Sequence, residues 1–383
     1  MKIGIDVTPL QIRGGRHGIG SYLRGLLPAL SARGARHEYV LFTYGGIERD
    51  LDGLSERFRT RRLPVPPIGR ARALLSHQLV LPLMGRALGL DLLHVPGVSV
   101  SASMPAIPLR PLVPTVVTVH DLSPLRFPTE ILPSWRQRIF YRAMLGAIAR
   151  ARHLLCDSRA TREDLVATLR IPAERITVAP LAPDPLFTTA RGSPEDPRAD
   201  AIEAEAYVLH VGGPAPLKNL ARVIDAIVAR WTTRAADTHL VCVSAVPCDP
   251  AALCPDAARY RTRIHVLEDV RPPFLRWLYQ HALCLAFPSL HEGFGLPVLE
   301  AMASGCPVIT SRVASLPEVG GDAAVYVEAL DVACIERALA DFIGDPARRE
   351  AARAAGLCQA RRFSHAATAA ATLAAYEAAS RRP

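Results

Sequence analysis

Short runs of apolar and β-branched residues alternate with longer amphipathic stretches along the whole chain. The first series of short runs comprises 3–7, 39–43, 92–95, 116–119, 154–156 and 176–178. A second series comprises 207–211, 240–243, 264–267, 283–287, 308–310 and 324–327. The stretches between the runs, such as 21–32 and 133–151, have the apolar spacing of helices. This alternation predicts an α/β fold with two parallel sheets, each covered by helices on both faces.

A segment rich in Pro, Asp and Ala separates the two series. Residues 185–204 have no clear period, which predicts a linker. We therefore expect a Rossmann-like N-terminal domain at 1–184 and a second Rossmann-like domain at 205–364. The alanine-rich end, 365–383, is expected to form a helix that packs back toward the N-terminal domain. Because ligands of doubly wound sheets bind beyond the carboxyl ends of the strands, we expect the site in a cleft between the domains.

Length and composition narrow the class of protein. The chain has 383 residues, which suits two domains, and half of them are hydrophobic, which excludes a disordered or fibrous protein. The start, MKIGIDVTPLQI, alternates like a strand and lacks the layout of a signal peptide, and no apolar run reaches transmembrane length. The eight cysteines contain no C-x-x-C pair. We expect a cytoplasmic protein with reduced thiols.

The basic charge lies in the first half of the chain. Residues 1–183 hold 25 Lys and Arg against 13 Asp and Glu, a net charge of +12, whereas the remainder is at −3. One basic stretch carries Arg57, Arg59, Arg61, Arg62, Arg70 and Arg72. It leads into 73–88, which could form an apolar-faced helix. The combination suits either peripheral contact with an anionic membrane or a solvated face beside a core helix. Nucleic acid is not an expected partner, because the basic stretch has no recognisable nucleic-acid-reading motif.

The segment 287–310 reads FPSLHEGFGLPVLEAMASGCPVIT and holds two glutamates, Glu292 and Glu300. An apolar strand precedes a Gly-Phe-Gly loop, and Pro297 stands where the first turn of a helix tolerates a residue without an N–H group. Glu292 then lies just before the helix and Glu300 about one turn inside it. Free amides and the helix dipole at this end favour a phosphate or a sugar hydroxyl. The pattern predicts half of a nucleotide-sugar site.

Three further features could complete such a site. The loop RGGRHGIGSY after the first strand carries glycines, including Gly18, that could let the backbone approach a diphosphate, although a plain flexible turn explains them as well. His120 ends the strand VVTVHD, where its side chain could donate to a sugar hydroxyl or position a proton. Lys218 precedes a helix, and a cation at that end suggests a role with a departing diphosphate.

The sequence offers little for a metal ion. Asp50 and Asp52 form a D-x-D pattern, but they lie in GGIERDLDG, where acidic loop residues explain them better. No H-x-x-x-H pair or cysteine cluster is present. We therefore expect no metal site and no cofactor, with the nucleotide sugar as a substrate.

With these residues in place, the chain resembles the retaining GT-B glycosyltransferases of family 4, also called group 1. The resemblance covers nearly the whole chain. It is carried by HGIGSYLRGLLPAL, VVTVHDL, CDSRATREDL, ITVAPLAPDPLF, VGGPAPLKNL, FPSLHEGFGLPVLEAMASGCPVITS and SLPEVGGDAAVYV. It implies two Rossmann-like domains that face each other across a cleft, and transfer of a sugar from a nucleoside diphosphate with retention of configuration.

The resemblance also implies a role for each matching residue. Glu292 would contact the donor sugar, and Glu300 would hold the ribose hydroxyls. Gly18 would approach the diphosphate, Lys218 would stabilise it, and His120 would act near the sugar. The backbone amides of Phe294, Gly295 and Leu296 would bind sugar hydroxyls or phosphate.

Two positions depart from the family pattern. Gly213 stands where many members have an arginine, so a second cation for the leaving group is missing from its expected place. His291 stands where an aromatic residue is common, and we expect this difference to change the donor pocket.

The sequence thus predicts a glycosyltransferase that is similar to bacterial mannosyl and rhamnosyl transferases of polysaccharide assembly. We expect a GDP-sugar donor and a lipid-linked or oligosaccharide acceptor at the inner face of the membrane. The alternatives are a UDP-sugar-dependent transferase, an epimerase of the same fold, or a non-catalytic subunit that binds a nucleotide sugar.

Overall fold

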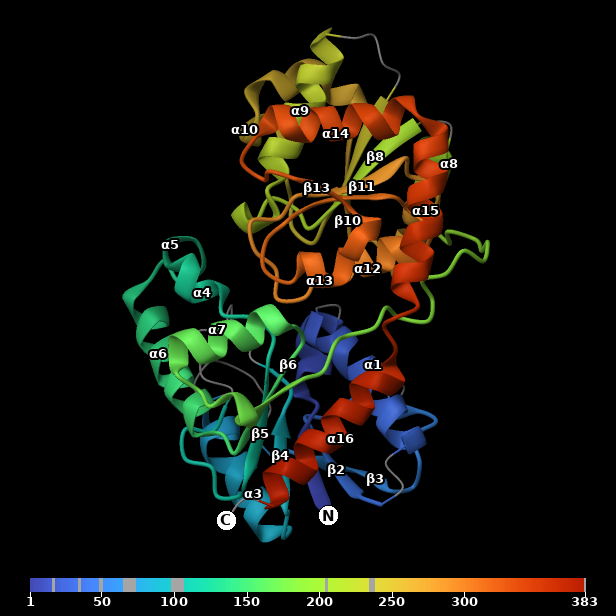
Figure 1. Ribbon diagram of the computed structural model, residues 1–383. Coiled ribbons are helices and arrows are strands. Elements are labelled where there is room, and N and C mark those ends of the chain that lie inside the picture. The colour runs from blue at the N-terminus through green and yellow to red at the C-terminus, as the bar shows by residue number, and fades with distance from the viewer. Residues whose placement is uncertain are drawn as a thin grey trace. The chain divides into compact units, whose positions relative to one another are not determined.

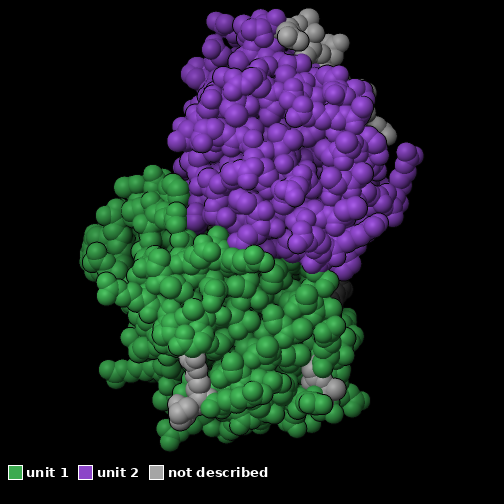
Figure 2. Space-filling view, viewed as in Figure 1, with its two compact units in different colours: residues 1–182, 364–383 green, residues 183–363 purple. Residues whose placement is uncertain are grey.

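The computed structural model comprises two compact units, each built around one parallel sheet (Figure 1). Unit 1 is residues 1–182 with 364–383, and unit 2 is residues 183–363 (Figure 2). The residues described are 1–15, 18–33, 36–47, 51–64, 74–97, 107–203, 206–233 and 238–381, and the side chains of 12–15 are not included.

The sheet of unit 1 has seven strands in the order β3-β2-β1-β4-β5-β6-β7, and every paired neighbour is parallel. The strands are β1 (Lys2–Asp6), β2 (Glu38–Thr43), β3 (Phe58–Arg62), β4 (Leu92–Val95), β5 (Thr115–Val119), β6 (His153–Cys156) and β7 (Ile176–Val178). All residues of β4, β5 and β6 are buried, because helices cover both faces of the sheet.

The helices of unit 1 follow the strands in the alternating order that the sequence predicts. They are η1 (Thr8–Gly15), α1 (Gly18–Arg33), η3 (Ser76–Val80), α3 (Leu81–Ala87), α4 (Ser123–Arg126), α5 (Pro128–Ile131), α6 (Trp135–Arg150), α7 (Arg159–Leu169), η4 (Ala173–Arg175) and α16 (His365–Arg381). On one face, the inner side chains of α6 pack against the sheet in a cluster that includes Val117, Tyr141, Met144 and Ile148. The carboxyl end of β5 is therefore fixed by a packed helix.

The C-terminal helix α16 packs on α1 and on β4 to β7 within unit 1. Its approach to α1 is close, because a Cβ atom at Gly25 would meet the ring of His365. Tyr376 of α16 lies within hydrogen-bond distance of His94 Nδ1, at 2.7 Å, and His94 Nε2 lies 2.8 Å from Thr118 Oγ1. Buried polar contacts thus connect the end of the chain to β4 and β5.

The sheet of unit 2 has six parallel strands in the order β10-β9-β8-β11-β12-β13. Its strands are β8 (Ala206–Val211), β9 (Thr238–Ser244), β10 (Ile264–Glu268), β11 (Cys284–Phe287), β12 (Val308–Ser311) and β13 (Val325–Val327). In strand order this is 3-2-1-4-5-6, the dinucleotide-binding arrangement in which the order reverses between the first and fourth strands. The carboxyl ends of β8 and β11 flank that reversal.

The helices of unit 2 cover both faces of this sheet. They are α8 (Arg198–Glu203), η5 (Pro216–Lys218), α9 (Leu220–Thr233), α10 (Pro250–Leu253), η6 (Pro255–Arg263), α11 (Pro272–His281), α12 (Leu296–Ala303), α13 (Leu316–Gly320), η7 (Gly321–Ala323), α14 (Val332–Gly344) and α15 (Pro346–Ala360). Helices α9 and α14 pack together over one buried cluster that includes Val223, Ile227 and Leu339.

Both series of expected strands are present, which confirms the predicted fold class of two doubly wound sheets. Strand β3 is an additional strand at the edge of the first sheet. Its sequence FRTRR has no apolar alternation, and its four residues after Phe58 are exposed. It pairs only with β2, and the ring of Phe58 stacks on Tyr39 at 4.3 Å. An edge strand pairs on one side and is often exposed, so its sequence shows little of the apolar alternation that predicts a strand.

The segment 185–204, predicted as a linker, falls inside unit 2. Its last part contains α8, whose apolar residues Ala199 and Ile202 are each 2% exposed. Two apolar positions three residues apart are too few to reveal a helix against a Pro- and Asp-rich background.

Three arginines of the basic stretch lie on one strand. Arg59, Arg61 and Arg62 lie on β3, whereas Arg70 and Arg72 lie outside the described residues. The apolar helix expected at 73–88 is present from residue 74. Residues 74 and 75 are helical and precede η3, which α3 follows. Three leucines at four-residue spacing are exposed there: Leu75, Leu79 and Leu83. No helix in the described part of the chain is long and apolar enough to span a membrane.

Candidate active site

Lys218 and Glu292 form an ion pair in unit 2. Lys218 Nζ donates to Glu292 Oε1 at 2.7 Å, and the two side chains are 28% and 11% exposed. The ammonium also lies 5.1 Å from the centre of the Phe287 ring, at the end of β11. Because an ammonium has three donors, it can hold the carboxylate and still offer N–H groups to an anion. The structure thus brings together two residues that lie 74 positions apart in the chain.

The backbone on both sides of Lys218 fixes its position. Gly212 has φ +142°, and a Cβ atom there would lie 2.8 Å from Cγ of Lys218, so the glycine leaves room for the lysine stem. Asn219 follows in the left-handed conformation, at φ 60°. Its buried amide donates to the carbonyls of Pro288 and Ala329 at 2.9 and 2.7 Å. Lys218 is therefore held at the start of α9 by neighbours that cannot easily move.

Glu292 precedes α12 in a loop that its backbone shapes. Gly295 adopts φ +102° as the cap of the helix, and a Cβ atom there would lie 2.8 Å from Leu316. The buried hydroxyl of Ser315 lies 2.9 Å from the carbonyl oxygen of Glu292 and 2.8 Å from that of Phe294. Leu296 then begins the helix, with Pro297 in its first turn as expected. The first amides of a helix have no partner within it, so this end can receive an anion or a hydroxyl.

Glu300 lies in the second turn of α12, where neighbouring residues shield its carboxyl from solvent. Desolvation there raises the pKa of its carboxyl to about 8, and repulsion from Asp184 adds to the shift. The buried hydroxyl of Tyr279 donates to Glu300 Oε2 at 3.3 Å, which limits the shift. Glu300 is therefore largely protonated at neutral pH in the ligand-free protein.

Gly213 packs against β9 of the same unit. Its φ is +67°, and a Cβ atom there would collide with the hydroxyl of Ser244. A side chain at the position of the family arginine would therefore have to displace the hydroxyl of Ser244. His291, the second departure from the family pattern, is buried at 7% exposed.

His120 lies directly after β5 of unit 1, where the side chain is 18% exposed. Its Nδ1 lies 2.5 Å from Asp157 Oδ2, and its Nε2 lies 3.2 Å from the carbonyl oxygen of Pro96. The carboxylate of Asp157 raises the pKa of the imidazole, against the opposing effect of burial. His120 thus has an acceptor at each ring nitrogen.

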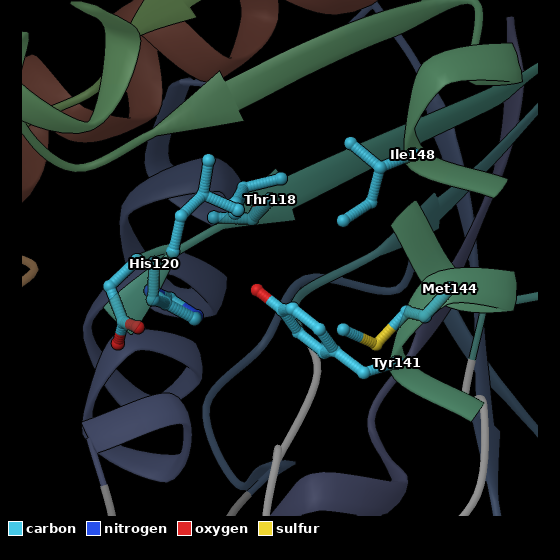
Figure 3. A pocket seen from close by; sticks show the side chains of 8 residues that line it. Thr118, His120, Tyr141, Met144 and Ile148 are labelled. Atoms are coloured by element: carbon cyan, nitrogen blue, oxygen red, sulfur yellow. The ribbon is translucent and has the colours of Figure 1, made fainter. Parts of the chain in front are cut away.

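His120 also borders a small cavity in unit 1, between the end of β5 and the inner face of α6 (Figure 3). Figure 3 shows the hydroxyl of Tyr141 pointing into this space, and this hydroxyl has no hydrogen-bond partner in the described part of the chain. Met144 and Ile148 supply the apolar wall. Such a cavity can take a water molecule or one hydroxyl group beside His120.

Gly18 is the first residue of α1 and is exposed, with open space around it. Gly14 and Gly15 end η1, and residues 16 and 17 of the expected glycine loop lie outside the described part. Asp50 lies outside it as well, and Asp52 is an exposed turn residue. Within the described residues, no group of three acidic, cysteine or histidine side chains could hold a metal ion.

Three residues of these surroundings were not singled out in the sequence: Asp157, Tyr279 and Ser315. Each is at least nine-tenths buried and bonds to a candidate residue or its loop. Asp157 had a detectable signal, since it directly follows a buried strand next to the strand of His120. The other two are placed by helices whose packing the sequence does not reveal.

Two family models match the chain. "Glycosyltransferase Family 4" matches residues 16–185, and "Glycosyl transferases group 1" matches residues 205–345. O-antigen chain mannosyltransferase B of Escherichia coli is 30% identical, over 65% of this chain and 66% of that protein. O-antigen chain mannosyltransferase RfbU of Salmonella typhimurium is 28% identical, over 55% of this chain and 56% of that protein. The matched regions thus span less than two thirds of these relatives.

Among solved structures, sucrose-phosphate synthase from Thermosynechococcus elongatus superposes with a TM-score of 0.75 at 18% identity, over 98% of both chains. This likeness confirms the GT-B fold class. With family models matching both halves, the chain belongs to glycosyltransferase family 4, the group 1 glycosyl transferases.

Proposed function

We propose that this protein transfers a sugar from a nucleoside diphosphate donor to a hydroxyl group of a polysaccharide acceptor, with retention of configuration. The Lys218–Glu292 ion pair beside the start of α12 carries the proposal. It sets a cation, a carboxylate and helix amides within one unit, which suits a diphosphate and a sugar ring. The chain's membership of the family supports the same reaction. The two relatives support it as well, since both are named as mannosyltransferases.

In the proposed reaction, the bond between the anomeric carbon and the diphosphate oxygen breaks, and the electron pair leaves with the diphosphate. A bond from the acceptor oxygen to the same carbon forms on the same face of the sugar. The acceptor proton passes to the departing phosphate oxygen. Lys218 and the start of α12 would stabilise the new negative charge, Glu292 would hold the sugar, and His120 would act beside it. Gly18 and the amides of 294–296 would contact the donor, and Glu300 its ribose.

The assignment is tested with Glu292→Gln and Lys218→Ala in a donor-hydrolysis and transfer assay. We expect each substitution to lower the turnover at least about 100-fold while the fold is kept. Arg222→Ala, at a cation on α9 that bonds to Asn219, serves as a matched control for loss of a positive charge. Near wild-type transfer in both site variants would show that the assignment is wrong.

For the donor, we propose GDP-mannose, with GDP-rhamnose as the next choice. The two relatives' names favour mannose. A panel of GDP and UDP sugars, each followed by slow hydrolysis of the donor, identifies the base and the sugar. Hydrolysis of a UDP sugar alone would replace this proposal with the UDP-dependent alternative. Epimerised sugar without hydrolysis would indicate an epimerase, and binding without turnover a non-catalytic subunit.

The proposal needs no metal ion or cofactor, since Lys218 and the helix start supply positive charge. Transfer that is unchanged by EDTA supports this part, whereas loss of transfer that Mg²⁺ or Mn²⁺ restores contradicts it.

We further propose a lipid-linked acceptor and peripheral contact of unit 1 with an anionic membrane. The support is the exposed leucine row of η3 and α3 together with the arginines of β3. Exposed apolar and basic side chains on the same unit suit the boundary between headgroups and acyl chains. We expect vesicles containing phosphatidylglycerol to bind the protein at low salt, and Leu79→Glu with Leu83→Glu to weaken that binding. Failure of the wild type to bind removes the proposal.

A further inference from the structure

The hydrogen-bond partners of His120 indicate its protonation state, which its position after β5 does not by itself reveal. An imidazolium has two N–H donors, whereas a neutral imidazole has one donor and one acceptor. Here both ring nitrogens face oxygen acceptors, the carboxylate of Asp157 at 2.5 Å and the carbonyl of Pro96 at 3.2 Å. Only the protonated ring can donate to both.

Asp157 is an unusual residue for its place. It is 2% exposed, and its second oxygen, Oδ1, has no hydrogen-bond partner among the described residues. A buried carboxylate is costly unless a cation and hydrogen bonds compensate for it. The hydrogen-bond partner of its other oxygen, Oδ2, is His120, so the pair fits a carboxylate and an imidazolium. A purely structural role would be met at lower cost by an apolar residue at the end of β6.

Further neighbours restrain the imidazole ring of His120. Gly97 has φ +106°, and a Cβ atom there would lie 2.5 Å from Cδ2 and Nε2 of His120. The ring of Tyr22 on α1 meets the imidazole edge-on, with centroids 5.4 Å apart. Ser158 caps α7 next to Asp157 by accepting from the Thr161 amide at 3.1 Å, and Thr161 Oγ1 donates to the carbonyl of His120 at 3.2 Å. The pair is therefore held from β4, α1 and α7.

The charged and titratable groups around His120 favour its protonated form. Burial disfavours the charged form of His120, but Asp157 and Asp121 raise the pKa of the imidazole above its ordinary value. Burial also raises the pKa of Asp157, and His120 opposes that shift. His94, from β4, is itself neutral, because burial lowers its pKa to about 3. Tyr22, from α1, stays a neutral phenol, because burial raises its pKa. No described neighbour brings a permanent positive charge against the ring among these contacts.

We propose that Asp157 is a positioning residue that keeps His120 as an imidazolium during sugar transfer, so that His120 supplies a positive charge and an N–H donor and does not act as a base. When a substrate oxygen reaches Nε2, it replaces the carbonyl of Pro96 while Asp157 holds the opposite nitrogen. This inference rests on the proposed function for its role in turnover. The inferred charge state of the pair rests on the contacts around His120, and it can be measured without substrate.

The first experiment is an NMR titration of the histidine ring protons in the full chain, with His120 assigned by its absence in His120→Gln. We expect the His120 pKa in the wild type to exceed 6.5, and Asp157→Asn to lower it by about one unit or more. A wild-type pKa at or below 6.5 would overturn the proposal, even if the variant does not fold. This result does not depend on donor or acceptor, so it separates the inference from the proposed function.

The second experiment is the pH profile of kcat with the donor found by the panel. A required imidazolium makes kcat fall as the pH rises through its pKa. We therefore expect Asp157→Asn to move this basic limb about one unit to lower pH, and Asp157→Glu to restore part of the shift. Asp164→Asn, which removes the surface carboxylate paired with Arg126 at 2.5 Å, is the matched control and should leave the limb in place. An unmoved limb in Asp157→Asn would overturn the proposal.

Discussion

Each unit places one cation and one carboxylate together where the strands of its sheet end, but the two pairs differ in access to solvent. In unit 1, the side chains of His120 and Asp157 are 18% and 2% exposed. In unit 2, Lys218 and Glu292 are 28% and 11% exposed. The buried pair is suited to fixing a charge state, whereas the more open pair is suited to exchanging partners with a substrate.

The difference follows from chemistry. Lysine stays charged without help, so its partner need not hold the proton in place, and it can turn toward an incoming phosphate. Histidine is poised near neutrality, so a buried carboxylate decides whether it is charged. The comparison predicts that charge removal at Lys218 acts mainly on turnover, and that changes around His120 act mainly on its pH dependence.

The largest effect is expected from removing the positive charge of Lys218, the cation of the more exposed pair. Lys218→Met keeps the stem that passes Gly212 but removes the charge, and we expect kcat to fall about 100- to 1,000-fold. Lys218→Arg serves as the charge-keeping control and should retain more activity than the methionine variant. Steady-state kinetics with saturating donor measure the change. A loss confined to KM would mean that Lys218 serves binding alone and would remove the contrast between the pairs.

A smaller effect is expected when a methyl group is placed against the buried pair. Gly97→Ala introduces a Cβ atom 2.5 Å from the His120 ring at a backbone φ of +106°. We expect a loss of about 1–3 kcal/mol in the free energy of unfolding, together with lower turnover. Denaturant titration and kinetics measure both. Gly89→Ala is the control, since its φ is +63° but nothing lies within 4 Å of its added methyl group. Equal losses in the two variants would show that backbone strain alone is responsible.

Adding the family arginine is expected to harm the fold without helping the reaction. Gly213→Arg must place a side chain at φ +67° against the hydroxyl of Ser244. We expect a loss of about 1–3 kcal/mol of stability and no gain in kcat. Ser244→Ala combined with Gly213→Arg relieves the collision and should recover part of the stability. A rise in kcat in the single variant would mean that the loop can open to take a second cation.

Glu300 should link stability to pH. Because its folded pKa of about 8 lies above the usual value of 4.5, its contribution is fully present below about pH 4.5 and is lost as the pH rises toward 8. We expect Glu300→Gln to remove this decline and to be more stable than the wild type near pH 8.5, by a margin that grows as the pH rises from 4.5 to 8. Thermal unfolding from pH 5 to 9 measures it. Parallel curves for the two proteins would place the Glu300 pKa near its ordinary value.

The smallest effect is expected at a surface pair. The Arg126 side chain is 58% exposed where it meets Asp164, so solvent screens the attraction. Arg126→Ala should change stability by less than about 1 kcal/mol and leave the pH profile of turnover unchanged. A larger loss, measured by urea titration, would show that exposure does not separate this pair from the buried one.

Much of the site was predictable because its parts are local in the sequence. The loop with Gly295, the helix start at Leu296 and Pro297, and the strand before Glu292 lie within one short segment, so spacing and turn chemistry indicate them directly. Likewise, His120 follows a run of buried residues. The roles of these residues in donor binding stay predictions until the variants are measured.

Asp157 and Tyr279 were not predicted, since each acts through a partner far along the chain. Asp157 reaches His120 only because β5 and β6 are adjacent in the sheet, and Tyr279 reaches Glu300 from α11. Strand β3 was missed for another reason, because an exposed edge strand carries no apolar alternation.

The sequence by itself determined the alternation of strands and helices, the two-sheet fold and the residues that head each helix or end each strand. These follow from local hydrophobic period, glycine and proline, which act within a few residues. The tertiary structure alone decided which charges meet. The Lys218–Glu292 and His120–Asp157 pairs form across strands and loops that only the packed sheet brings together.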